Sequence, residues 1–269
     1  MIPEDPPAGS DVPLVSLPQD SQHAMARPVR VRASDMRPGR RVLPHSHEWC
    51  QLAYASEGVL AVYTSQGSWV VPPERAVWIP ARTDHEVYAP HGAKFRSLHL
   101  DTDFARGMPE SCCVLTVSTL LKELLIHAAS IREDYDTEGE DGRLMQVIMD
   151  QILAAPTVPL HLPMPQDARL RRITEALVEN PGDNRSLEEM AGISGASSRT
   201  LARLFTKELG VTFRQWRQQC RLMASMERLA LGEPVTNVAL DLGYDSPSAF
   251  IAMFKRTLGK PPTAYFGGK

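Results

Sequence analysis

The chain has 269 residues, of which 43% are hydrophobic and 23% charged, and its formal net charge is −3. This length allows two domains of ordinary size, and no apolar run approaches the roughly 20 residues that cross a bilayer, so membrane spans are not expected. The first residues lack a basic and apolar leader, and the four cysteines show neither metal-finger spacing nor a disulfide framework. We therefore expect a cytoplasmic protein in a reducing compartment.

The charge is unevenly distributed along the chain. Residues 167–269 contain 15 Lys and Arg against 11 Asp and Glu, a net charge of +4, which leaves −7 for residues 1–166. A basic excess in one part of a chain is what a nucleic-acid partner requires. The excess is modest, so it supports a DNA-binding carboxyl-terminal half without establishing one.

The amino-terminal part begins with residues 1–28, where six prolines among small and polar residues predict a disordered tail. From residue 29 to about 110, short β-rich runs are separated by Gly and Pro, which is typical of a sandwich or jelly-roll barrel. The expected strands are Val29–Arg32, Cys50–Ala55, Val59–Thr64, Ser68–Val71, Ala76–Ile79, Glu86–Tyr88 and Phe95–Leu100.

Three histidines in this region have the spacing of a binding site. His45 and His47 are two residues apart on an expected strand and would project to the same side, where His85 from a neighbouring strand could join them. Three imidazoles, with a fourth oxygen from Gln51, could bind a divalent transition metal. The pattern resembles the two motifs of the cupin family, with Gln51 where that family usually has Glu and Arg82 where it usually has Gly.

The Gln51 position leaves two interpretations open. A neutral amide lacks the charge that would hold a divalent ion most firmly, which disfavours an Fe(II)-type oxygenase site. The histidines could instead bond one another or an organic ligand. The sequence therefore demands no cofactor and leaves a divalent metal ion possible; the candidate residues for the effector or metal are His45, His47, Gln51 and His85.

Residues 111–155 contain two helical patterns, Val117–Ile131 and Gly142–Ala155, each with a wide apolar stripe. Such stripes can cover an open face of the barrel or pair two subunits, and we expect a homodimer. Four prolines in residues 156–166 then predict an extended, semi-rigid linker that marks the domain boundary.

The remaining segment, residues 167–269, contains an internal repeat. The run Ser197–Gly210 returns 49 residues later as Ser246–Gly259, with apolar residues in matching positions. In each copy two short helices meet at a glycine-containing turn, and the first copy opens with the Ser186/Glu189 capping box. Each copy is therefore predicted to be a helix-turn-helix.

The two copies are joined by a helix of about 19 residues, Thr212–Leu231, which would span about 28 Å. Recognition helices that enter successive major grooves lie about 34 Å apart. A small all-helical domain with a duplicated packing unit is the alternative. Two copies on a spacer of this length favour a reader of two adjacent grooves.

The segment from Ser186 to Phe266 resembles the DNA-binding region of the AraC/XylS family of bacterial transcription regulators. The resemblance lies in Arg221-Leu222, Ala239–Tyr244, Phe254-Lys255 and Gly259–Tyr265. It implies an α+β protein of two domains: a cupin-like barrel with two helices, then an all-α domain with two helix-turn-helix units. The implied function is promoter binding modulated by a small effector or metal ion in the barrel, without enzymatic activity, with double-stranded DNA and RNA polymerase as partners. The alternative is a metal-dependent cupin enzyme fused to a DNA-binding module.

Outward positions of the two second helices are the candidate DNA contacts. Arginine can bond a guanine bidentately, so Arg199 and Arg203 are the expected main base readers, and the first unit should supply most of the discrimination. The base-reading set is Ser198, Arg199, Ala202, Arg203, Ser248, Ile251 and Ala252. The phosphate-contacting set is Lys207, Arg221, Lys255 and Arg256.

Overall fold

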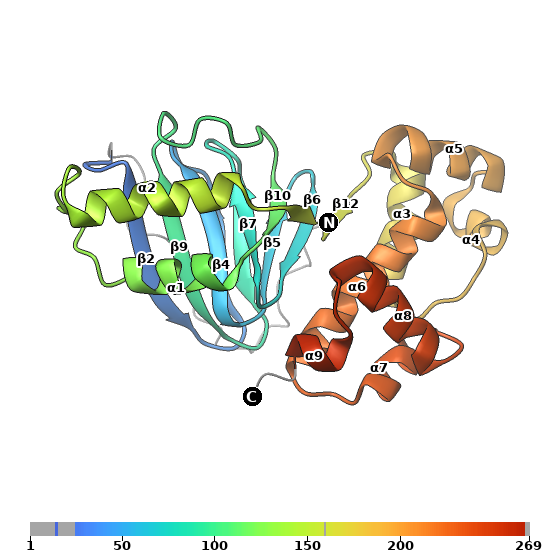
Figure 1. Cartoon of the computed structure of the whole chain (residues 1–269). Coiled ribbons are helices and arrows are strands. Elements are labelled where there is room, and N and C mark those ends of the chain that lie inside the picture. The colour runs from blue at the N-terminus through green and yellow to red at the C-terminus, as the bar shows by residue number, and fades with distance from the viewer. Residues whose placement is uncertain (1–13, 16–24, 159, 267–269) are drawn as a thin grey trace. The chain divides into compact units, whose positions relative to one another are not determined.

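The computed structural model describes residues 14–15, 25–158 and 160–266, so most of the predicted tail lies outside the described residues. The chain divides into two compact units. The described part of the β-rich unit falls within residues 10–64 and 69–160, and the helical unit comprises residues 161–266 with the turn Ser65–Ser68. Each unit is described by itself below (Figure 1).

The β-rich unit contains two sheets in which neighbouring strands are mostly antiparallel, as the sequence predicts for a jelly-roll barrel. One sheet has the order β1 (Leu14–Val15), β3 (Arg40–His45), β8 (His85–Ala89), β5 (Leu60–Thr64) and β6 (Gly67–Val71). The other has the order β11 (Thr157–Val158), β10 (Cys113–Thr116), β7 (Arg75–Ile79), β4 (Cys50–Gly58), β9 (Ala93–Leu100) and β2 (Val29–Met36).

Four of these strands are not expected from the sequence: β1, which lies within the predicted disordered tail, β3, β10 and β11, which lies within the predicted linker. Pro44 in β3 has no backbone N–H to donate, and the register of β3 with β8 shifts between Val42 and His45. Because β3 ends at His45, His47 lies in the connection to β4. The prediction that both histidines occupy one strand is therefore wrong, although the two imidazoles still meet.

Helices α1 (Thr119–Ala128) and α2 (Glu140–Leu153) lie across the outer face of the second sheet (Figure 1). Side chains from both helices form one apolar cluster with strands β2, β4, β7 and β9. The structure thus shows the covering role of these helices. The outer side of the pair still exposes large apolar residues: Leu120, Ile126, Val147 and Leu153.

The helical unit begins with β12 (His161–Pro163) and α3 (Ala168–Glu179), which Asp167 caps. The first helix-turn-helix consists of α4 (Leu187–Ser194) and α5 (Ser198–Leu209), the second of α7 (Val235–Asp241) and α8 (Pro247–Leu258). Between them α6 (Phe213–Ala230) is helical throughout, and α9 (Pro262–Phe266) follows α8. The predicted two-unit fold is confirmed, with its spacer helix unbroken.

Local signals account for most of these boundaries. The predicted capping box of Ser186 with Glu189 forms, and Thr212 with Gln215 forms a second one at the start of α6. Gly195 ends α4 in the left-handed conformation, with φ of 70°. None of the helices in the described ranges is long and apolar enough to cross a membrane.

Candidate DNA interface and effector site

Helices α5 and α8 present the predicted base-reading side chains on their outer surface. Arg199, Ala202 and Arg203 are exposed on α5, whereas Ser198 is half-buried at its first turn. Buried Leu201 and Phe205 fix which side of the helix faces outward. On α8, the exposed positions are Ser248, Ile251 and Ala252. The two arginines thus lie one turn apart on an exposed surface of α5.

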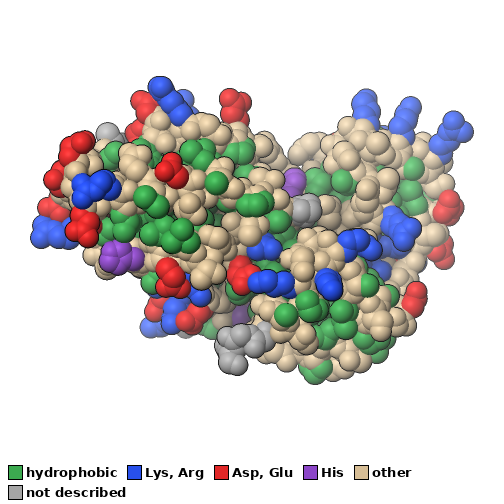
Figure 2. Space-filling model, viewed as in Figure 1, with side chains coloured by type: hydrophobic (Ala, Val, Ile, Leu, Met, Phe, Trp, Pro, Cys, Tyr) green, Lys and Arg blue, Asp and Glu red, His purple; other side chains and the backbone are tan. Residues whose placement is uncertain are grey.

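The cationic side chains around these helices divide into two kinds. Lys207, Lys255 and Arg256 are exposed, as phosphate contacts must be. Figure 2 shows Lys and Arg side chains projecting from the surface over α5, in the view of Figure 1. Arg221, in contrast, is only 8% exposed, and its guanidinium donates hydrogen bonds to oxygens inside the unit. The prediction that Arg221 contacts a phosphate is wrong, because that face of α6 is turned into the core.

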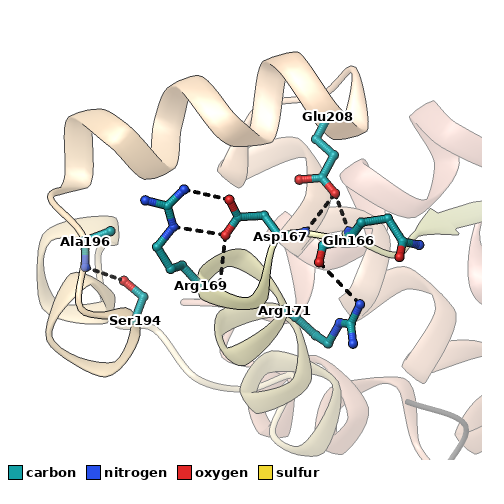
Figure 3. Close-up of polar contacts among 7 residues, drawn as sticks. All are labelled: Gln166, Asp167, Arg169, Arg171, Ser194, Ala196 and Glu208. Carbon is teal, nitrogen blue, oxygen red and sulfur yellow. Dashed lines mark hydrogen bonds and ion pairs between the residues drawn. The ribbon is translucent and has the colours of Figure 1, made fainter.

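The segment from Pro163 to Asp167, here called the connector, leads into α3 and is hydrogen-bonded to the first helix-turn-helix (Figure 3). The Glu208 carboxylate, near the end of α5, accepts hydrogen bonds from the backbone N–H groups of Gln166 and Asp167. Asp167 in turn caps α3 and pairs with Arg169 at 2.6 Å. The indole of Trp216 on α6 donates to the carbonyl of Pro163 at 2.8 Å. The connector therefore has defined partners on both α5 and α6.

In the β-rich unit, the three predicted histidines come together. One ring nitrogen from each of His45, His47 and His85 lies within 4.8 Å of the others. His47 and His85 are 5% and 1% exposed, and His45 is half-buried. Gln51 joins the cluster: its Oε1 lies 2.9 Å from Nε2 of His47 and 3.0 Å from Nε2 of His85.

Each of these rings directs Nδ1 at a backbone carbonyl oxygen. The partners are Leu43 for His45 at 2.7 Å, Trp49 for His47 at 2.7 Å and Thr83 for His85 at 2.8 Å. A carbonyl oxygen only accepts, so Nδ1 carries the proton in each ring and Nε2 keeps its lone pair. This is the tautomer and the backbone support that metal-binding histidines use.

Burial keeps these rings neutral. It lowers the pKa of His85 to about 3, with the neighbouring His45 adding to the effect. Burial is also the main cause of the lowered pKa of His45 and of His47. Neutral imidazoles with free Nε2 lone pairs are competent ligands at neutral pH.

Gln51 has two consistent arrangements in this cluster. As placed, its Oε1 faces two imidazole lone pairs while its amide donates to Ser97 Oγ at 2.8 Å. The acceptors Gln51 Oε1, His47 Nε2 and His85 Nε2 then face one another with no proton between them. A bound cation would satisfy all three. Two ligand atoms that each lie about 2.1 Å from an ion, with a right angle at the ion, are about 3.0 Å apart. The distances from Gln51 Oε1 to the two Nε2 atoms are close to this value. With the amide rotated by 180°, its NH₂ would donate to both rings and no ion is needed. The donor set as placed therefore fits a divalent transition metal, and the set with the rotated amide would leave the site to a polar organic ligand.

Several residues next to this cluster were not among the predicted site residues. The Trp49 ring stacks on both His47 and His99, with centroid distances of 5.0 Å and 5.3 Å, and Ser97 accepts a hydrogen bond from Gln51. Ser97 and His99 alternate along β9 and face Ala53 and Gln51 in the register with β4. Strand alternation was the one signal that could have located them.

Comparisons with known proteins agree with both halves of the structure. Residues 27–191 match the family model described as an AraC-like ligand binding domain, and residues 190–267 match a helix-turn-helix domain. The chain is 38% identical over 221 residues to the HTH-type transcriptional regulator NimR of Escherichia coli, covering 82% of this chain and 81% of NimR. It is 36% identical over 107 residues to the regulator RipA of Corynebacterium glutamicum, covering 40% of this chain and 32% of RipA. Among solved structures, ToxT from Vibrio cholerae aligns over 90% of this chain and 98% of its own, with 12% identity and a TM-score of 0.38.

Proposed function

Since this chain belongs to the AraC family of transcription regulators, we propose a division of labour within it: α5 and α8 enter successive major grooves, and the histidine cluster receives the effector. A ligand-binding domain followed by a helix-turn-helix DNA-binding domain makes the protein a DNA-binding regulator. In our proposal it acts in the cytoplasm as a homodimer, contacts RNA polymerase and catalyses no reaction.

The exposed pair Arg199 and Arg203 is the observation that supports the DNA-reading part. Selection of binding sites from a random duplex library tests it directly. We expect a motif of two blocks whose centres are about one helical turn apart, with the more stringent block containing guanines. Recovery of a single block would contradict the two-groove proposal.

The convergent Nε2 lone pairs of His45, His47 and His85 support the effector part. Imidazole suits Zn²⁺, Ni²⁺ and Cu²⁺, and the neutral Gln51 adds no charge that would favour harder ions. We therefore propose a late transition metal as the preferred occupant. A metal held there would supply a positive charge in a site that otherwise has none from its ligands.

Thermal melting of chelator-treated protein, with each of these ions added in turn, tests this occupant. An ion at 100 times its Kd should stabilise the native protein by about 2.7 kcal/mol, and His47→Ala should abolish the shift. His127→Ala is the matched control, since this histidine lies at the end of α1, outside the cluster. If no ion shifts the melting of the wild type, the rotated amide and an organic effector become the better interpretation.

Coupling between the two sites follows from thermodynamic linkage. An effector that changes promoter affinity must itself bind with a changed affinity when DNA is present. Titrating the metal with and without the selected duplex measures this, and equal affinities would remove the coupling. A metal-dependent enzyme fused to a DNA-binding module would show turnover that is lost in His47→Ala.

A further inference from the structure

The spacer helix α6 carries a buried arginine that the DNA-reading surface does not use. Arg221 is 8% exposed, although arginine is rarely buried without a charged partner. Its four hydrogen bonds instead go to carbonyl and amide oxygens. These acceptors are the backbone oxygens of Pro181, Asp183 and Gly243 and the side-chain oxygen of Asn184, at 2.9 to 3.2 Å.

These acceptors lie in two loops, one that leads into the first helix-turn-helix unit and one inside the second. Pro181, Asp183 and Asn184 lie in the loop between α3 and α4, which leads into the first unit. Gly243 lies in the turn between α7 and α8 of the second unit, and the guanidinium also sits over the Tyr244 ring, 5.6 Å from its centroid. One planar group with five N–H donors thus bonds both units from the helix that separates them.

The two loops that Arg221 joins also touch each other directly. A Cβ added to Gly243 would lie 2.5 Å from the carbonyl oxygen of Gly182, and one added to Gly182 would collide with the carbonyl oxygen of Asp241. Gly243 in addition has φ of 73°, a conformation that side chains rarely adopt. Backbone therefore packs directly on backbone here, with no room for a side chain at either glycine.

We propose that Arg221 is the positioning residue that fixes the relative orientation of the two helix-turn-helix units. By this means it sets the spacing of the two DNA blocks that the protein accepts. This inference rests on the proposed two-groove function. Arg221 touches no DNA and acts by holding α5 and α8 in one register.

Arg217, one turn before Arg221 on the same helix, provides a matched control. It is half-buried, lies over the Phe213 ring and donates to the carbonyl of Arg185 at 2.7 Å. Arg185 directly precedes α4, so this hydrogen bond of Arg217 is made on the side of the first unit. Loss of Arg217 should affect stability without releasing the second unit.

The experiment measures affinity for duplexes that carry both selected blocks, with one or two base pairs inserted or deleted between them. Each added base pair rotates one block by about 34° and shifts it by about 3.4 Å. The full-length wild type should lose about tenfold or more in affinity per single base-pair change, and so should Arg217→Met. Arg221→Met should lose less than about threefold per change, from a lower affinity for the optimal duplex. All three proteins should bind a duplex with only the first block equally well.

Separate outcomes identify what has failed. An Arg221→Met profile as sharp as that of the wild type overturns this proposal alone. The proposal is also overturned if Arg221→Met keeps the spacing dependence of the wild type and binds the single-block duplex and the two-block duplex with the same loss of affinity. That result would mean a purely structural role for Arg221. A wild type indifferent to spacing overturns the two-groove function and this proposal together. If Arg221→Met is unfolded at the assay temperature, Arg221→Lys replaces it, because an ammonium keeps the charge but cannot reach both loops.

Discussion

The two helix-turn-helix units differ in their surfaces far more than in their cores. Phe205 and Phe254 occupy matching positions and are both fully buried, as are Leu201 and Phe250. The outward positions of α5 carry Arg199 and Arg203, whereas the matching residues of α8 are Ser248 and Ala252. The buried residues that fix the geometry of each unit match, whereas the exposed residues at corresponding positions differ. This comparison predicts equal stability effects in the two cores and unequal DNA effects on the two surfaces.

The largest effects should come from the two cores. Phe205→Ala and Phe254→Ala should each lower the free energy of unfolding by about 3–5 kcal/mol, since each removes a fully buried ring and leaves a cavity. Urea unfolding followed by circular dichroism measures both. A cost below about 1 kcal/mol in one variant only would show that the two units are not equivalent in packing.

On the surface, Arg203→Ala should have the largest effect on DNA binding. Loss of a bidentate contact to guanine should cost about 1–3 kcal/mol and relax specificity at one position of the first block. Repeating the binding-site selection with the variant checks this. An unchanged motif would mean that Arg203 does not read a base.

Lys255 should behave differently, because a phosphate contact positions the protein without reading sequence. Lys255→Ala should weaken binding to all sequences alike. The negative slope of log affinity against log salt concentration should become less steep by about 0.9. Thr206 occupies the matching position on α5, so Thr206→Ala serves as the uncharged control. A loss confined to certain sequences would argue that Lys255 contacts a base.

The smallest effect is expected at Ser248, the counterpart of Arg199. Ser248→Ala removes one exposed hydroxyl near the start of α8 and should change the affinity by less than about 0.5 kcal/mol. Competition binding against the wild type can resolve such a difference. A loss comparable to that of Arg203→Ala would reverse the assignment of the first unit as the main reader.

The helical unit could be predicted closely because its signals are local. Capping residues, helix-ending glycines and apolar spacing all lie within a few residues of the boundaries they set, as Ser186 with Glu189 and Gly195 show. Arg221 was misjudged because its burial depends on loops 40 residues before it and 22 residues after it. No local pattern separates such an arginine from an exposed one.

The histidine cluster could be predicted in part. The spacing of His45, His47 and His85 identified the residues that meet, but not that His47 lies outside a strand. The tautomers of the rings also depend on three backbone carbonyls whose positions only the folded chain defines. The choice between a metal and an organic effector turns on the orientation of one amide, Gln51.

The hydrogen bonds of Glu208 have a mechanical consequence for regulation. They fasten the chain just before α3 to the last turn of the helix that carries Arg199 and Arg203. A displacement of the chain at Pro165 would thus act on α5 directly, whereas it would act on α8 through α6 and through the loop between α3 and α4. The unit that we propose as the main reader of sequence is therefore also the one that the chain before α3 contacts directly.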